Sequence, residues 1–395
     1  MSAHNLSILQ VVPYYYPAWA YGGIPRVVYE LSTELSRRGH DVAVFTTDVL
    51  DRHLRSSYSS REVNINGVRA RYFRNLSNRL AYDHQIYLPL GMRKAVRKTI
   101  ANFDIIHIHG HRNLLNNIIH CSAQRFQKNY IFSAHGTAIP IERRVFVKRI
   151  FDLVFGNRIL RDAKRFIAVS EKEVEQYGMM GITPDRVSVV YNGLDIGAFH
   201  NLPEKGTFRH RYGLEGKEII LFLGKITPRK GVDFLVRSYA MLQRDNAVLV
   251  IAGNDMGYKT KVDRIIAERN LGGRVLYTGI LVDDSKLAAY RDADVVVYPS
   301  VYEVFGLVPF EALLCGTPVI VADDCGCGEI IGREGIGGIV RYNDERGLSD
   351  AIVEVLENRE HACEMARRGK SFVERELSWG MIASQYEDVY CRSLA

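Results

Sequence analysis

The sequence lacks the features that mark membrane-spanning, secreted or repetitive proteins. No apolar stretch approaches the ~20 residues that a membrane-spanning helix needs. The N-terminal region has no basic segment followed by an apolar core and a small-residue cleavage site, so we expect no signal peptide. Low-complexity tracts and short-period repeats are also missing. These absences predict a cytoplasmic globular protein.

Cysteine is scarce, with six residues in a chain of 395. Cys325 and Cys327 form the only close pair, and no second Cys or His pair at zinc-finger spacing follows them. We therefore expect small buried thiols in a reducing compartment, with neither a disulfide framework nor a structural zinc site.

Common nucleotide-binding signatures are absent as well. No Gly-x-Gly-x-x-Gly pattern follows a first strand, which argues against an NAD-dependent enzyme. Gly224-Lys225 is followed by Ile226 in place of Ser or Thr, so this loop is not of the Walker type. The pI of about 9.0 would suit nucleic-acid binding, but no aromatic motif of a known binding module accompanies the basic residues. We expect no nucleic-acid partner.

The positive charge is concentrated in the first half of the chain. Residues 1–195 hold 27 Lys and Arg against 16 Asp and Glu, a net of +11, whereas the remainder has a net of −4. A charge that served solubility alone would be spread more evenly. The N-terminal half is therefore expected to meet an anionic partner.

The chain contains two successive series of β-rich runs and amphipathic stretches. In the first series, strands are expected at 8–12, 42–46, 68–73, 105–109, 131–134, 166–169 and 187–191, with helices at 25–38 and 90–101. The second series predicts strands at 219–223, 248–252, 275–278, 295–298 and 319–321, with helices at 232–243, 259–270, 285–291 and 307–314. This alternation predicts an α/β protein with two doubly wound, Rossmann-like domains. We place them at 1–195 and 196–378, with ligands at the carboxyl ends of both sheets.

The segment from Glu303 to Glu311 follows an apolar run, so it lies just past a strand. Pro309 suits the first turn of a helix, and Phe305-Gly306-Leu307 would then offer free N–H groups at the helix start, where phosphate binds well. The two carboxylates could hold opposite ends of an extended ligand, Glu311 the ribose and Glu303 a sugar. Alternatively, both are acidic residues that the helix dipole favours near a helix start.

A second loop, Gly224–Gly231, brings Lys225, Arg229 and Lys230 together directly after a strand. Such cations would balance the charge of a diphosphate, most of all when it departs as a leaving group. A solvated basic turn is the alternative.

Two features of the first half also lie past expected strand ends. Gly22-Gly23 precedes a helix, where the absence of side chains lets a ligand approach the backbone, although a simple turn explains it too. His135-Gly136 ends the strand at 131–134, where a lone His is more often structural.

Two further patterns resemble metal sites and are discounted. His107, His109 and His111 would share one strand face, but no carboxylate or Cys completes a site locally. Asp292 and Asp294 form an Asp-x-Asp pair that leads into a buried strand. We expect no metal.

Residues 143–155 mix paired cations with large apolar side chains. Helical spacing gathers apolar residues on one side, with cations beside them: Val147, Ile150, Phe151 and Val154, with Arg144, Lys148 and Arg149. A core-facing helix with a basic rim is the favoured interpretation. The alternative is an interfacial helix that rests on anionic lipid and presents the site to a lipid-linked acceptor.

Together these segments resemble the retaining GT-B glycosyltransferases of family 4 over essentially the whole chain. The Glu-x7-Glu pattern of Glu303 and Glu311 is the most specific element. Lys225 stands where this family usually has Arg, which keeps the charge but loses bidentate geometry. Other motifs match in order and spacing: Gly22-Gly23, His135-Gly136, 168–171, 191–195 and 315–319.

The resemblance implies metal-independent transfer with retention and no cofactor, the nucleotide sugar being a substrate. It implies these roles: Glu311 on the ribose, Lys225 and Lys230 on the diphosphate, Glu303 and the 305–307 backbone on the donor sugar, Gly23 on the phosphate, and His135 near the reacting carbon. It also implies a last helix, 379–395, that returns to the first domain. The donor would be a UDP-sugar or GDP-mannose, and the acceptor a glycan or a lipid-linked acceptor. The protein would work in the cytoplasm, at the inner face of the membrane where its acceptor is lipid-linked.

Other functions remain open on the sequence. One is an epimerase or a phosphorylase on the same fold, although no set of acid and base residues for epimerisation is evident. Another is a catalytically inactive GT-B scaffold or binding subunit, which the presence of both Glu303 and Glu311 disfavours.

Overall fold

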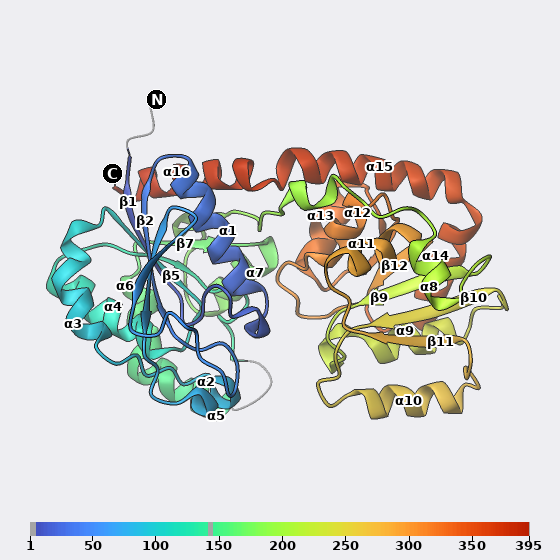
Figure 1. Cartoon of the computed structure of the whole chain (residues 1–395), viewed down its shortest axis with the longest axis horizontal. Helices are drawn as coiled ribbons and strands as arrows, with labels where there is room; N and C mark the ends of the chain where they lie inside the picture. The colour runs from blue at the N-terminus through green and yellow to red at the C-terminus, as the bar shows by residue number, and fades with distance from the viewer. Residues whose placement is uncertain (1–4, 141–144, 395) are drawn as a thin grey trace. The chain divides into compact units, whose positions relative to one another are not determined.

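A computed structural model of the chain describes residues 5–140 and 145–394 (Figure 1). The chain divides into two compact units, each with its own sheet. Unit 1 comprises Met1–Gly193 and Trp379–Ala395, and unit 2 comprises Leu194–Ser378. Both units have helices around a predominantly parallel sheet, which confirms the expected α/β class. Among the described residues, no helix is both long and apolar enough to cross a bilayer.

Unit 1 contains an eight-stranded sheet in the order β3-β4-β2-β1-β5-β6-β7-β8. Its strands are β1 (Ser7–Val11), β2 (Asp41–Thr47), β3 (Glu62–Ile65), β4 (Val68–Phe73), β5 (Ile105–His109), β6 (Ile131–Ser133), β7 (Arg165–Ala168) and β8 (Val187–Val189). Strands β1 and β5 are buried over nearly their whole length, as expected for parallel strands covered on both faces. Of the strands in the described part of this unit, only β3 is antiparallel to its neighbour.

Helices cover both faces of this sheet. They are α1 (Gly23–Arg37), α2 (Asn78–His84), α3 (Met92–Thr99), α4 (Leu114–Arg125), α5 (Val145–Phe151), α6 (Asn157–Asp162), α7 (Glu171–Met179) and α16 (Trp379–Leu394). A π-helical turn, Asp152–Gly156, joins α5 to α6. The last helix, α16, lies beside α1 and buries Trp379, Ile382 and Tyr386 in the core of this unit (Figure 1).

Unit 2 contains a six-stranded parallel sheet in the order β11-β10-β9-β12-β13-β14. Its strands are β9 (Glu218–Leu223), β10 (Ala247–Ala252), β11 (Val275–Gly279), β12 (Val295–Tyr298), β13 (Val319–Ala322) and β14 (Gly338–Val340). Its helices are α8 (Thr207–Tyr212), α9 (Val232–Tyr239), α10 (Lys259–Glu268), α11 (Asp283–Asp292), α12 (Val308–Leu314), α13 (Gly326–Glu334), α14 (Glu345–Glu357) and α15 (Arg359–Glu376). A core of aliphatic and aromatic side chains from β9, β10 and β12 packs against α9 and α14.

The chain reverses its direction of winding once within each sheet. In unit 2, β9 lies between β10 and β12, so the loops after β9 and β12 leave neighbouring strands and turn to opposite sides. In unit 1, β1 lies between β2 and β5 in the same way. Such switch points, at the carboxyl ends of the strands, are where open α/β sheets bind ligands.

Candidate functional site

The predicted residues of unit 2 gather at its switch point, where two loops are held together by a glycine. Gly231 has a φ of +66°, and a Cβ added there would lie 2.1 Å from the carbonyl oxygen of Pro299. Only glycine permits this close approach between the loop after β9 and the end of β12. The contact brings Lys230, the preceding residue, against the loop that contains Glu303.

Lys230 and Glu303 form the centre of the site. Lys230 Nζ donates hydrogen bonds to Glu303 Oε2 and to Tyr298 Oη, each at 2.5 Å. Burial alone would lower the pKa of Lys230, but Tyr298 and Glu303 beside it raise the pKa above its usual value. Burial would likewise raise the pKa of Glu303, but the Lys230 ammonium lowers it. The pair is therefore ionised at neutral pH.

The other two cations of this loop differ in their surroundings. Lys225 is exposed, and it has no ion-pair partner among residues 5–140 and 145–394. Partial burial of its amine and the charge of Lys230 lower the pKa of Lys225. Arg229 Nη2 donates to the carbonyl oxygen of Tyr302 at 2.5 Å, so it ties the two loops together. A direct contact of Arg229 with a donor stays a prediction.

The turn before α12 has the geometry that the sequence predicted. Gly306 has a φ of +85°, and a Cβ there would lie 2.9 Å from the Tyr298 ring. Phe305 is buried against Phe310, and Leu307 begins the helix with no side-chain hydrogen bond to its first N–H groups. The first turn of α12 therefore has no side-chain cap, which leaves its leading N–H groups open to donate a hydrogen bond to a ligand.

Glu311 has two partners that sequence reasoning missed. Lys286 Nζ contacts both of its carboxylate oxygens at 3.0 and 3.1 Å, and Tyr290 Oη donates to Oε2 at 2.9 Å. Lys286 and Tyr290 stand one turn apart on α11, and this spacing can be read from the sequence. The strand order that brings α11 next to α12 cannot be read from the sequence.

The remaining predicted residues, Gly22, Gly23 and His135, lie in unit 1. Gly22, with a φ of +107°, caps α1, and a Cβ on Gly22 or Gly23 would meet nothing within 4 Å. His135 follows β6 with a φ of +51°, which a non-glycine residue rarely adopts. Its Nε2 lies 2.9 Å from His109 Nδ1, and burial lowers the pKa of His135 to about 4.

The backbone around His135 is fixed from α7. Glu173 accepts hydrogen bonds from the N–H groups of Gly136 and Val169 at 2.6 and 2.9 Å, and the N–H of Ala134 donates to Tyr177 Oη at 2.8 Å. Burial raises the pKa of Glu173 to about 7. These bonds hold His135 in its unusual backbone conformation.

The buried histidines and Glu173 should make the stability of unit 1 depend on pH. Burial keeps His107, His109, His111 and His135 neutral by lowering their pKa values. Unfolded histidines titrate near 6.5 and thus bind more protons than the folded ones below that pH, so stability is lost as the pH falls. Using a folded value of about 4, His135 alone accounts for about 2 kcal/mol between pH 7 and pH 5.

Glu173 has the opposite effect, because its pKa is raised to about 7 from 4.5. Its contribution is present at low pH and is lost as the pH rises through 7, so acidification to pH 5 returns about 2 kcal/mol. Glu173→Gln should therefore steepen the loss of stability on acidification. Both tryptophans, Trp19 and Trp379, lie in unit 1, so their fluorescence in urea titrations at pH 7, 6 and 5 measures this effect. Identical pH slopes for both proteins would contradict the prediction.

The discounted patterns have structural roles. Asp292 accepts from the N–H groups of Gly206, Phe208 and Arg209, and thereby caps α8. His111 leaves the strand face expected for it, because β5 ends at His109, and it pairs with Asp152 at 3.1 Å. That carboxylate, 41 positions away, was not expected. Within the described ranges, no group of three or more His, Cys, Asp or Glu residues could hold a metal ion.

The cysteines agree only partly with the expectation of buried thiols. All six are free, and Cys325 and Cys327 are fully buried with their sulfur atoms 3.2 Å apart. Cys121, Cys363 and Cys391 are exposed, contrary to the expectation. They occupy the outer faces of α4, α15 and α16, where a small side chain is tolerated.

The expectation for the basic segment is wrong in one respect. Arg143 and Arg144 lie outside the described residues. Most of the apolar side chains that follow are exposed: the exposed fractions reach 76% for Phe146 and 77% for Leu153, and Val147, Ile150 and Val154 are also exposed. Phe151 is half-buried and packs against His111 and Phe155. Periodicity identified an apolar side but could not tell which way it faces.

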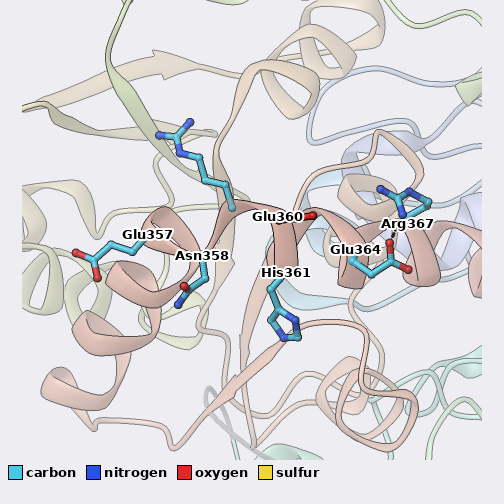
Figure 2. Close-up of a pocket in the computed structure, with 7 residues that line it drawn as sticks. Glu357, Asn358, Glu360, His361, Glu364 and Arg367 are labelled. Carbon is cyan, nitrogen blue, oxygen red and sulfur yellow. Dashed lines mark hydrogen bonds and ion pairs between the residues drawn. The ribbon is translucent and has the colours of Figure 1, made fainter.

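A hollow of about 670 Å³ lies in unit 2 where α14 meets α15, and no predicted site residue lines it (Figure 2). Charged and polar side chains line it, among them the ion pair of Glu364 with Arg367. Arg359, which also lines the hollow, bonds Glu218 and Asp294 at 3.2 and 3.1 Å and so anchors the start of α15. Arg359 and Arg367 are both engaged in ion pairs here, so we assign no ligand to this hollow.

Comparisons with known proteins agree with this geometry. The model described as "Glycosyl transferases group 1" matches residues 204–372, and that of "Glycosyltransferase Family 4" matches residues 21–197. An uncharacterized glycosyltransferase of Methanocaldococcus jannaschii is 30% identical, with 97% of each chain covered. A D-inositol 3-phosphate glycosyltransferase of Kineococcus radiotolerans is 29% identical over 94% of this chain and 91% of that protein.

Solved structures show the same fold. The Anabaena protein HepE in complex with UDP has a TM-score of 0.77 at 17% identity, covering 98% of this chain and 100% of that one. Sucrose-phosphate synthase from Thermosynechococcus elongatus has a TM-score of 0.77 at 23% identity, covering 98% and 99%. The chain belongs to the group 1 glycosyltransferases and has their GT-B fold.

Proposed function

We propose that this glycosyltransferase moves a sugar from a nucleotide sugar, either a UDP-sugar or GDP-mannose, to a glycan or lipid-linked acceptor with retention of configuration. The observation that supports this most is the joint placement of Lys230, Glu303 and Glu311 around one switch point. HepE, a structural neighbour, was crystallised with UDP and with UDP-glucose, which supports UDP as the first nucleotide to test.

Each residue at the switch point has a distinct task in this proposal. Glu311, oriented by Lys286 and Tyr290, accepts hydrogen bonds from the ribose hydroxyls. Lys225, which has no ion-pair partner within the described chain, and Lys230 face the diphosphate. Glu303 and the N–H groups near Leu307 orient the donor sugar. Arg229 keeps both loops in register and adds positive charge.

In the transfer, the bond from the anomeric carbon to the acceptor oxygen forms while its bond to the diphosphate oxygen breaks. The nucleoside diphosphate leaves with the bonding electrons and takes the acceptor proton, so no separate base is required. Glu303 is paired with Lys230, which makes it a weak nucleophile and favours attack on the same face as departure. From unit 1, the N–H groups at Gly22-Gly23 contact the phosphate, and His135 contacts the sugar. The main catalytic effect is electrostatic.

The cations of the loop after β9 predict that transfer needs no divalent metal. Lys225 and Lys230 supply the positive charge that a metal ion would supply to a departing diphosphate. We expect chelation of metals with EDTA to leave the initial rate within twofold of its starting value, and added Mg²⁺ to change it equally little. A rate that falls on chelation and returns with Mg²⁺ would contradict this proposal.

Donor identity is tested by calorimetry with UDP and GDP, followed by a panel of their sugars in a hydrolysis assay. Glu311→Gln should weaken nucleotide binding at least tenfold, because a neutral amide accepts fewer bonds from the ribose. Glu303→Gln should leave nucleotide affinity unchanged and lower turnover. NMR of the product gives its anomeric configuration. Failure to bind either nucleotide would favour the inactive scaffold.

For the acceptor, the exposed apolar side chains of α5 and of the π-helical turn that follows it support a membrane-bound substrate. Phe146 and Leu153 are more than three-quarters exposed, and unit 1 carries the positive charge of the chain. A helix with this pattern rests on anionic lipid with its apolar side inserted. The proposed location is therefore the inner face of a membrane.

Co-sedimentation with phosphatidylglycerol-containing and neutral vesicles tests this contact. We expect binding to the anionic vesicles, lost in Phe146→Glu/Leu153→Glu. Met179→Glu, at an exposed apolar residue of α7 in the same unit, is the matched control and should bind normally. If lipid charge has no effect, a water-soluble acceptor becomes the better candidate. An inositol phosphate would be tested first, because a relative of this chain is named a D-inositol 3-phosphate glycosyltransferase.

A further inference from the structure

A chain of hydrogen-bonded side chains leads from His135 into the interior of unit 1. It passes through β5, β1, α16 and β6 in the order His135, His109, Gln10, Tyr390, His107, Ser133. The successive distances are 2.9, 2.6, 3.1, 2.9 and 2.8 Å. All members beyond His135 are fully buried, at 0% exposure. A network this complete fixes where each proton lies, since every donor must face an acceptor.

Gln10 determines the direction of the chain, because its two amide atoms differ in kind. Its Oε1 faces His109 Nε2 at 2.6 Å, and its Nε2 faces Tyr390 Oη at 3.1 Å. The short distance suits an oxygen acceptor, since two nitrogen atoms pack farther apart. Gln10 Oε1 can only accept, so the proton lies on His109 Nε2.

The proton positions of the neighbours follow from this one. Burial lowers the pKa of His109 well below its usual value, so the ring is neutral. Its Nδ1 therefore has no proton and can only accept a hydrogen bond. His135 Nε2 must therefore donate to His109 Nδ1. On the other side, Gln10 Nε2 donates to Tyr390 Oη, which donates to His107 Nδ1, and His107 Nε2 donates to Ser133 Oγ.

We propose that Gln10, acting through His109, fixes His135 as the tautomer whose Nδ1 is an acceptor. His135 then receives a hydrogen bond from a hydroxyl of the donor sugar and cannot offer one. Gln10 and His109 are positioning residues, and His135 is the residue that touches the sugar. The sugar contact rests on the proposed function, whereas the tautomer does not. The consequence is a preference for sugars that present a hydroxyl to His135 over those that present hydrogen or a carboxylate.

The tautomer is measured by nitrogen-15 NMR of the histidine side chains in the ligand-free protein. We expect His135 to carry its proton on Nε2, with the Nδ1 shift of an unprotonated ring nitrogen. Gln10→Met removes the acceptor for His109 and should let the two tautomers of His135 mix. Ser133→Ala changes only the far end of the chain and should leave His135 as it is. A proton on His135 Nδ1 in the unaltered protein overturns the inference without any variant.

Activity measurements then separate the tautomer from the reaction. With a transferable donor sugar, replacement of each hydroxyl in turn by hydrogen should reveal, beside the hydroxyls that Glu303 orients, one position at which kcat/KM falls about tenfold because the bond to His135 is lost. Gln10→Met should lose this discrimination, while UDP affinity stays unchanged, because none of the residues proposed to bind the nucleotide belongs to this chain of hydrogen bonds. Discrimination that survives in Gln10→Met contradicts the inference. If no donor is transferred, the proposed function fails while the NMR result still decides the tautomer.

Discussion

Lys230→Met is expected to lower kcat/KM for sugar transfer by about 10²–10³-fold, the cost usually seen when a preorganised charge is removed from a transition state. Methionine keeps the length of the apolar part of the side chain and removes the ammonium. The ammonium lies 2.5 Å from Glu303 Oε2 and 4.8 Å from the centre of the Tyr298 ring, so it is already fixed before a donor arrives. Catalysis by such a group needs no reorganisation during the reaction.

Two lysines serve as controls for this variant. Lys225→Met removes an exposed cation from the same loop, so its effect should be smaller, about tenfold, since solvent screens its charge. Lys217→Met changes an exposed lysine at the opposite, amino end of β9 and should leave the rate unaltered. Equal losses for Lys225→Met and Lys230→Met would show that the Glu303 pair has no special role.

A double-mutant cycle with Glu303→Gln separates charge pairing from catalysis. Lys230→Met leaves an unpaired carboxylate that is only about a quarter exposed, which destabilises unit 2 in addition to its effect on rate. The double variant removes both charges and should recover much of the stability. Its rate should stay low, because the cation is still missing. Recovery of rate together with stability would mean that Lys230 acts only through the fold.

The sequence predicted the parts of the fold that depend on uniform burial. Strands β5 and β12 are observed at the expected residues, and every position of both is buried, as in parallel strands covered on both faces. It did not predict β3, a four-residue edge strand whose pattern alternates exposed and partly buried positions. The sequence of such a strand looks like that of a loop, and only its pairing with β4 identifies it as a strand.

The site residues could be located because their motifs follow strands, and the carboxyl ends of neighbouring parallel strands meet. What each side chain contacts could not be predicted, because those partners are distant in the sequence. Lys286 reaches Glu311 across 25 positions, and Gln10 reaches Tyr390 across 380. Helical periodicity in α5 was likewise insufficient to predict burial. It shows which apolar residues share a side of the helix, but not whether that side faces the core or the solvent.

Gly231→Ala is expected to destabilise unit 2 by several kcal/mol and to abolish most activity. The added Cβ would lie 2.1 Å from the carbonyl oxygen of Pro299, a distance that no real Cβ adopts, so one of the two loops must move. Either movement takes Lys230 away from Glu303. The φ of +66° adds strain of about 1 kcal/mol for a residue with a side chain.

Gly213→Ala is a matched control, because it introduces the backbone strain of a positive φ without the collision between the added Cβ and the carbonyl oxygen of Pro299. Gly213 lies in the same unit with a φ of +64°, and a Cβ there would meet nothing within 4 Å. It should therefore lose only about 1 kcal/mol and keep full activity. Calorimetric unfolding detects the lowered transition of unit 2, while the fluorescence of Trp19 and Trp379 shows that unit 1 is unaffected. Similar losses of stability and activity in both variants would mean that the two loops at the switch point can move apart at little cost. In that case Gly231 would not be what fixes Lys230 against Glu303.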